Sequence, residues 1–235
     1  MNDLRKAQTA IEAVARRFSA TWKNSGDSRH AYITVGGKRV ALEIRTLKPG
    51  GADRGNAAKP GLRFDKVVTR VTRHLEAALG KAVPEGMTVL VTITAPIRLP
   101  GKTATALQEK IHISLECAAP GRDEKTTIYR NHIRIRLLQH ECRQAPKMIG
   151  FVHNPGTDPL ALFGMTGELL ELFGAEADKK HTRLAGDRWL VAVSPRAVSC
   201  VDAYRYICSQ LRVVTGFKKI LMLFSDGRVE VLEER

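Results

Sequence analysis

Hydrophobic residues recur at two spacings along the chain, and these spacings predict both helices and strands. Apolar positions three and four residues apart run through residues 3–23, 62–80 and a segment with Leu107, Ile111 and Leu115. These three segments are predicted to be amphipathic helices. Nearly continuous apolar runs at residues 87–95 and 147–152 predict buried strands instead.

The clearest local prediction is a β-hairpin near the start of the chain. Two alternating runs, residues 30–35 and 38–47, flank a pair of glycines that suits a two-residue turn. Alternation places Glu43 and Arg45 together on the face opposite the apolar side chains of the second strand. Residues 126–137 form a second hairpin-like region, in which Ile and Leu alternate with arginine.

The last third of the chain repeats the mixture of helices and strands. Residues 166–180 and 199–214 are predicted helices, residues 188–194 a buried strand, and residues 218–233 a hairpin. No fixed-period repeat and no clear linker separates these elements. We therefore predict a single α/β domain over residues 1–235, with helices flanking a mixed sheet. A subdivision near residue 150 is the alternative.

Positive charge is concentrated in the first two-thirds of the chain. The formal net charge is +14. Residues 1–150 carry 27 Lys and Arg against 13 Asp and Glu, whereas residues 151–235 carry 11 basic and 11 acidic residues. Such an imbalance favours a polyanionic partner such as nucleic acid. A solvated basic surface without a partner is the alternative.

Other classes of protein are not indicated. No apolar run approaches the ~18 residues of a membrane span and no secretion signal is visible, so the predicted location is the cytoplasm. The four cysteines lack C-x-x-C spacing and are interpreted as buried, reduced thiols. With 13 Phe, Tyr and Trp in the chain, stacking on unpaired bases is not favoured.

The second strand of the first hairpin carries an acidic residue followed, two positions later, by a cation. In "RVALEIRTLKPGG" (residues 39–51), this pattern follows a predicted helix and precedes another helix and a buried strand. The arrangement over residues 1–95 resembles the restriction-endonuclease-like superfamily, the PD-(D/E)XK nucleases. The resemblance implies a restriction-endonuclease-like core and phosphodiester hydrolysis that depends on Mg²⁺.

The resemblance also assigns roles to individual residues. Glu43 takes the position of the metal-binding Glu, and Asp27 becomes its partner as a metal ligand. Arg45 stands where the family has Lys, and Arg45 and Lys48 would steady the scissile phosphate. An ordinary cross-strand charge arrangement gives the same pattern, and this alternative stays open.

Two basic faces are further candidates for contact with nucleic acid. Arg63, Lys66, Arg70 and Arg73 recur three and four residues apart on the predicted helix 62–80, opposite its apolar stripe. Like charges at these spacings cost about 0.2–0.5 kcal/mol per pair, which contacts with phosphates would offset. The second hairpin adds Arg130, Arg134 and Arg136 on its predicted open face.

Other motifs do not develop into sites. Gly101-Lys102-Thr103 follows a strand as a P-loop does, but Pro96 stands where that motif needs glycine. Lys102 and Thr103 could still hold one anion at a helix start. The seven histidines do not cluster, and His132 and His153 are interpreted as isolated polar residues.

Together, these patterns predict a nucleic-acid-binding protein. If Asp27 and Glu43 hold Mg²⁺, it is a nuclease. The alternative is a non-catalytic nucleic-acid-binding or protein-interaction module that has lost the metal site.

Overall fold

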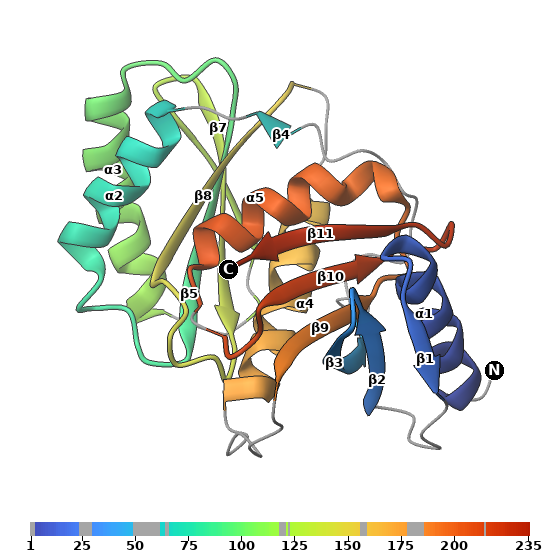
Figure 1. Cartoon of the computed structure of the whole chain (residues 1–235). Helices are drawn as coiled ribbons and strands as arrows, with labels where there is room; N and C mark the ends of the chain where they lie inside the picture. Colours follow the sequence, from blue (N-terminus) through green and yellow to red (C-terminus); the bar gives the residue numbers. More distant parts are fainter. Residues whose placement is uncertain are drawn as a thin grey trace.

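The computed structural model describes residues 3–23, 30–48, 62–63, 66–117, 121, 123–155, 159–177, 186–213 and 215–235. Two mixed sheets with flanking helices lie within these residues (Figure 1). The predicted α/β class is therefore confirmed, but the prediction of one sheet is corrected to two. None of the helices described is long and apolar enough to cross a membrane.

Sheet A combines the first and last parts of the chain. Its strands lie in the order β1 (Thr21–Lys23), β2 (His30–Val35), β3 (Lys38–Thr46), β9 (Asp187–Val193), β10 (Lys219–Leu223) and β11 (Val229–Glu234). Strands β3, β9 and β10 are parallel, and the other neighbours pair antiparallel. The predicted hairpin of β2 and β3 is confirmed, and both turn glycines have positive φ.

Sheet B is built from the segment that separates β3 from β9. Its strands lie in the order β4 (Leu62–Arg63), β8 (Met148–His153), β5 (Met87–Thr94), β7 (Asn131–Gln139) and β6 (Asp123–Ile128). Strands β5 and β8 are parallel, whereas β7 pairs antiparallel with β5 and β6. Ile133, Ile135 and Leu137 take the buried face of β7 that alternation predicts.

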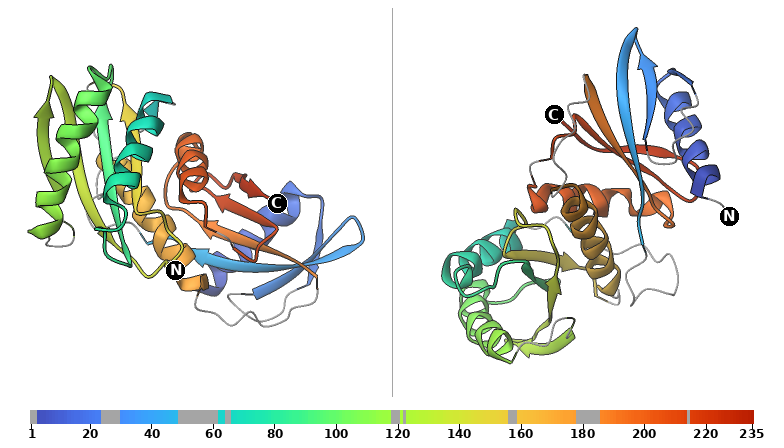
Figure 2. Two further views of the ribbon diagram at one scale, coloured as in Figure 1. Left: turned by 90° about the vertical axis from the view of Figure 1, so that its left-hand side faces the viewer. Right: turned by 90° about the horizontal axis from the view of Figure 1, so that it is seen from below.

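Helices cover the sheets in layers (Figure 2). Helix α1 (Asp3–Arg17) packs on the outer face of sheet A, and α2 (Lys66–Leu79) and α3 (Pro100–Glu116) pack on the outer face of sheet B. Helices α4 (Leu160–Ala177) and α5 (Val201–Leu211), with the short 3-10 helix η1 (Val198–Cys200), lie between the two sheets.

Helix α4 shows why two sheets can share one core. Its buried residues Leu162, Phe163, Leu169, Leu170 and Phe173 are too widely spread around the helix for a single apolar stripe. A helix that is hydrophobic all round must be covered on every side. The same core cluster includes residues of both sheets and of α5, which together cover α4.

A charged side chain in this middle layer is fully engaged in hydrogen bonds. Glu168 of α4 is 3% exposed; Arg196 donates a 2.8 Å hydrogen bond to its Oε1, and Tyr204 donates one of 2.6 Å to its Oε2. Burial and the neighbouring Glu168 carboxylate raise the pKa of Tyr204, which keeps its hydroxyl protonated as a donor. The network ties α4 to α5 and to the chain after β9.

Two sequence predictions are corrected in detail. The first helix ends at Arg17 instead of continuing to residue 23, because the backbone turns at Ser19 (φ 50°) and Trp22 joins β1. Three of the four cysteines are buried as expected, but Cys117 lies exposed at the end of α3.

Candidate functional site at one end of sheet B

Three helices begin at the same end of sheet B. Helix α3 follows the carboxyl end of β5, and α4 follows the carboxyl end of the parallel neighbour β8. Helix α2 follows β4, which pairs with the last residues of β8 (Figure 1). Ligands of open α/β sheets bind outside the carboxyl ends of the strands, and helix N-termini carry partial positive charge. This end is therefore suited to anions.

A buried asparagine joins two loops at this end. The side chain of Asn131 is 1% exposed; its Oδ1 accepts a 2.7 Å hydrogen bond from the backbone N–H of Arg98. Its Nδ2 donates to the Arg98 carbonyl and to the Thr103 hydroxyl, both at 2.8 Å. Asn131 thus fixes the loop between β5 and α3 against the turn between β6 and β7.

The joined loops present cations beside exposed apolar side chains. Leu99 is 54% exposed and follows the exposed Arg98. Tyr129 is 47% exposed and precedes the exposed Arg130. We call the surrounding surface the basic end of sheet B; its exposed cations are Lys66, Arg70, Arg98, Lys102, Lys125 and Arg130. A groove between α2 and the start of α3, which Arg70 and His74 line, continues this surface.

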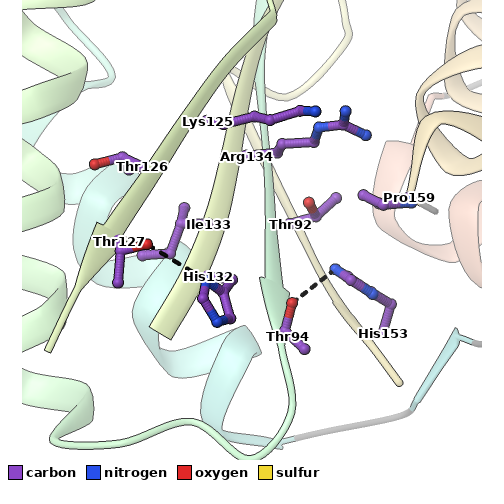
Figure 3. Close-up of a pocket in the computed structure, with 10 residues that line it drawn as sticks. All are labelled: Thr92, Thr94, Lys125, Thr126, Thr127, His132, Ile133, Arg134, His153 and Pro159. Atoms are coloured by element: carbon purple, nitrogen blue, oxygen red, sulfur yellow. Dashed lines mark hydrogen bonds between the residues drawn. The ribbon is translucent and has the colours of Figure 1, made fainter. Parts of the chain in front are cut away.

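A cavity of about 360 Å³ opens on the inner face of the same end (Figure 3). Strands β5, β6, β7 and β8 all contribute side chains to its lining, and Pro159 approaches from the start of α4. We call it the threonine–histidine pocket, because its polar lining is dominated by Thr92, Thr94, Thr127, His132 and His153. Lys125 and Arg134 add positive charge.

Strand register brings three donor side chains into one row. Thr92 pairs with Arg134 across β5 and β7, and Arg134 pairs with Lys125 across β7 and β6. The hydroxyl of Thr92 is buried, and the described residues provide no hydrogen-bond partner for it. Asp123 partly balances the charge of Arg134, with its Oδ2 3.4 Å from Nε. Lys125 is exposed.

The two histidines hold neighbouring hydroxyl groups in position. His153 is 6% exposed; its Nδ1 lies 3.0 Å from the Asn154 carbonyl, which makes this nitrogen a donor. Its Nε2 lies 3.2 Å from the Thr94 hydroxyl. His132 Nδ1 lies 3.3 Å from the Thr127 hydroxyl (Figure 3). Of the seven histidines in the chain, the fold brings these two to the lining of one pocket, where each contacts a different threonine.

The predicted basic helix face is exposed on α2. Lys66, Arg70 and Arg73 lie on its open surface, opposite buried Val68, Val71 and Leu75. Arg63 belongs to β4, ahead of the helix, and its side chain lies outside the described residues. Lys102 is exposed at the start of α3, whereas the Thr103 hydroxyl is buried and donates to the Arg98 carbonyl at 2.9 Å.

The arginines of β7 occupy a different environment from the predicted open face. Arg134 is 12% exposed at the threonine–histidine pocket, and the Arg136 guanidinium lies 6.0 Å from the Phe163 ring centroid. Helix α4 partly covers this face, because sheet B has helices on both sides. Arg130, in the turn between β6 and β7, is exposed as expected.

The residues of the nuclease hypothesis are only partly brought together. Glu43 is 4% exposed; Arg45 donates a hydrogen bond to its Oε1, and Arg188 of β9 donates one to Oε2 at 3.1 Å. Glu43 is buried because the helices between the two sheets cover its face of sheet A. Lys48 is exposed beyond β3, and Asp27 lies outside the described residues.

The surroundings of Glu43 do not fit a divalent cation. Each carboxylate oxygen accepts a hydrogen bond from a guanidinium group, and His30 Nε2 lies 4.0 Å from Oε1. Two permanent positive charges at these distances oppose a third cation. Elsewhere in the part of the chain that is described, no group of three His, Cys, Asp or Glu residues could hold a metal ion.

Sequence reasoning found four of the six cations of the basic end, but it missed Asn131, which holds the loops there, and Thr92 of the threonine–histidine pocket. Neither residue belongs to a sequence motif, and their roles depend on tertiary contacts. One signal was available in "IYRN", residues 128–131, where Tyr129 and Arg130 occupy a two-residue turn with φ of 48° and 62°. Such turns favour glycine or asparagine, so bulky residues there suggest a role outside folding.

Comparisons with protein-family models, with curated proteins and with solved structures find no match for this chain.

Proposed function

We propose that the protein binds nucleic acid at the basic end of sheet B and that it acts there by binding, without cleaving the strand. The observation that carries this proposal is the pair of loops joined by Asn131. Cationic Arg98 and Arg130 lie beside exposed Leu99 and Tyr129 in loops that Asn131 holds in place. Cations attract phosphates, and an exposed aromatic ring can stack on a base.

Single-stranded nucleic acid fits this surface better than a protein partner of acidic character does. An acidic protein would also satisfy the cations and could cover the ring, but a single strand supplies both a phosphate and a base at every nucleotide, which matches cations that stand beside an aromatic ring. Stacking on aromatic residues is typical of unpaired bases, because each base of a single strand exposes its face. Tyr129 therefore supports a role for stacking, which the low aromatic content of the chain alone did not favour.

The salt dependence of binding tests the proposal. A fluorescently labelled single strand of mixed sequence should bind more weakly between 50 and 200 mM salt, by roughly 50-fold if about four phosphates are engaged. Fluorescence anisotropy titrations at several salt concentrations give the slope. An affinity that does not change with salt, or no binding at the lowest salt, would exclude this proposal.

Cleavage assays separate binding from the nuclease alternative. Because two arginines already neutralise Glu43, we expect plasmid DNA and single-stranded RNA to remain intact with the protein in Mg²⁺ or Mn²⁺. Gel electrophoresis after long incubation is the measurement. Cleavage that is present in the wild type and lost in Glu43→Gln, with the variant still folded, would show that the metal-dependent alternative is correct.

A further inference from the structure

The proposed binding of a nucleic-acid strand to the surface of the basic end gives no role to the threonine–histidine pocket. Its volume of about 360 Å³ lies at the lower end of the range for small-molecule sites. A duplex cannot enter a cavity of this size. One end of a single strand can, with the rest of the strand leaving across the basic end.

The buried hydroxyl of Thr92 points to a ligand with acceptor atoms. Buried polar groups in folded proteins nearly always have a hydrogen-bond partner, and an exception needs a physical reason. Thr92 lies at the inner side of the pocket, in register with Arg134 and then Lys125 on the next two strands. Figure 3 shows these three side chains on the side of the sheet that faces Pro159. A donor with two cations beside it is suited to an anionic oxygen.

The helix next to the pocket adds to the preference for anions. Helix α4 begins at Leu160, directly after Pro159 of the pocket lining. The N-terminal end of a helix carries a partial positive charge. Asp123 offsets only part of the positive charge around the pocket, because its contact is with Arg134.

A terminal phosphate matches these features better than a phosphate within a strand. A phosphate monoester carries a charge of about −1.5 to −2 and three acceptor oxygens, whereas a diester carries about −1. A diester also continues as a chain in two directions, which a small cavity accommodates poorly. Thr127 and His132 line the pocket and pair only one register step before the turn with Tyr129, so a strand that leaves the pocket on this side passes that turn.

We propose that the threonine–histidine pocket binds the terminal phosphate monoester of a nucleic-acid strand. This inference rests on the proposed function, which it deepens by naming the chemical group that is recognised. The Thr92 hydroxyl and the Lys125 ammonium group bind the phosphate oxygens, and Arg134 supplies charge from the row between them. Tyr129 and Arg130 contact the nucleotides that follow.

Oligonucleotides with and without a terminal phosphate test the inference. Three fluorescently labelled strands of one sequence carry a 5′-phosphate, a 3′-phosphate or no phosphate, with the label placed internally. A phosphorylated strand should bind roughly 10- to 100-fold more tightly than the strand without phosphate, which is the range that one or two charge-assisted hydrogen bonds provide. The phosphorylated strand that gains affinity identifies the end that is recognised.

Thr92→Val is the decisive variant. Valine keeps a similar shape and removes a hydroxyl that has no partner among the described residues, so the variant should fold with unchanged or higher stability. It should lose the preference for the phosphorylated strand and keep the affinity for the unphosphorylated one. Thr105→Val, on the exposed side of α3, is the matched control and should keep the preference.

Two results would overturn the inference while the proposed function stands. One is equal affinity for all three strands, and the other is a preference that survives in Thr92→Val. If no strand binds, the proposed function fails instead, and inorganic phosphate then tests the pocket directly. Phosphate should shift the amide NMR signals of residue 92 and of His153 in the wild type but not in Thr92→Val; unchanged signals in the wild type would overturn the inference.

Discussion

Replacement of Glu168 by alanine is expected to lower the free energy of unfolding by about 3–5 kcal/mol. The substitution removes the acceptor of hydrogen bonds from Arg196 and Tyr204, and it leaves the Arg196 side chain, 12% exposed, without this counter-charge. Removing one partner of a buried ion pair is costly because the remaining charge has lost its solvent as well as its partner. Urea denaturation followed by circular dichroism measures the change.

Glu171→Ala provides the matched control on the same helix. Glu171 is exposed, so its loss should change the stability by no more than about 0.5 kcal/mol. Tyr204→Phe should have an intermediate effect of about 1–3 kcal/mol, because it removes the hydrogen bonds of the hydroxyl with Glu168 and Ser194 and keeps the ion pair. A Glu168→Ala variant within 1 kcal/mol of the wild type would mean that this network does not stabilise the middle layer.

Local patterns in the sequence were sufficient to predict most elements. The two glycines before β3 and the alternation of Ile133, Ile135 and Leu137 concern neighbours in the chain, and the structure confirms both predictions. The first helix was predicted too long because the apolar spacing continues to Trp22. That residue packs against the same cluster as α1, but from strand β1. Hydrophobic periodicity indicates which residues are buried, but it does not indicate the backbone turn at Ser19.

The second sheet could not be predicted from patterns of this kind. Whether β3 pairs with β9 or with β5 is decided by contacts between segments far apart in the sequence, and the pairing found is with β9. One indication was present in residues 160–173, where apolar residues occur on every side of α4. A helix of this kind needs cover on two sides, which one sheet with helices outside it does not supply.

The candidate site shows the same division between local and distant information. The exposed cations of α2 follow from helical spacing, and Lys66, Arg70 and Arg73 lie where they were predicted. The pocket depends on strand register, because Thr92 and Arg134 are adjacent only when β5 pairs with β7. The buried state of Glu43 depends in turn on Arg188, which β9 brings to it from far along the chain.

Reversal of two charges at the basic end should give the largest loss of binding. The double variant Arg98→Glu, Arg130→Glu is expected to weaken binding of a single strand by about 100-fold or more, because each hydrogen bond to a charged group contributes about 1.5–3 kcal/mol. The side chains of both residues are exposed, and Asn131 contacts only the backbone of Arg98, so the fold should be preserved. Anisotropy titrations, with thermal unfolding as a check, give the result.

The salt slope distinguishes phosphate contacts from a general effect of charge. If both arginines contact phosphates, the slope of log affinity against log salt should become shallower by about 1.4, since each contact with a single strand contributes about 0.7. The control is Lys81→Glu, Arg143→Glu, which makes the same charge change at exposed positions beyond the opposite end of sheet B. Equal losses in the two double variants would show that net charge, and not the basic end, governs binding.

Tyr129→Ala completes this comparison because it changes no charge. Loss of stacking on one base should weaken binding of a single strand by about 1–3 kcal/mol and leave the salt slope unchanged. Binding of a duplex should be affected little, since its bases are stacked on one another. The arginine variant should have a shallower salt slope, and the tyrosine variant should bind single strands more weakly with an unchanged slope. Both results together would show that phosphates and bases bind to the same pair of loops. If Tyr129→Ala binds single strands as tightly as the wild type does, Tyr129 does not stack on a base, and the arginines bind polyanions without a preference for single strands.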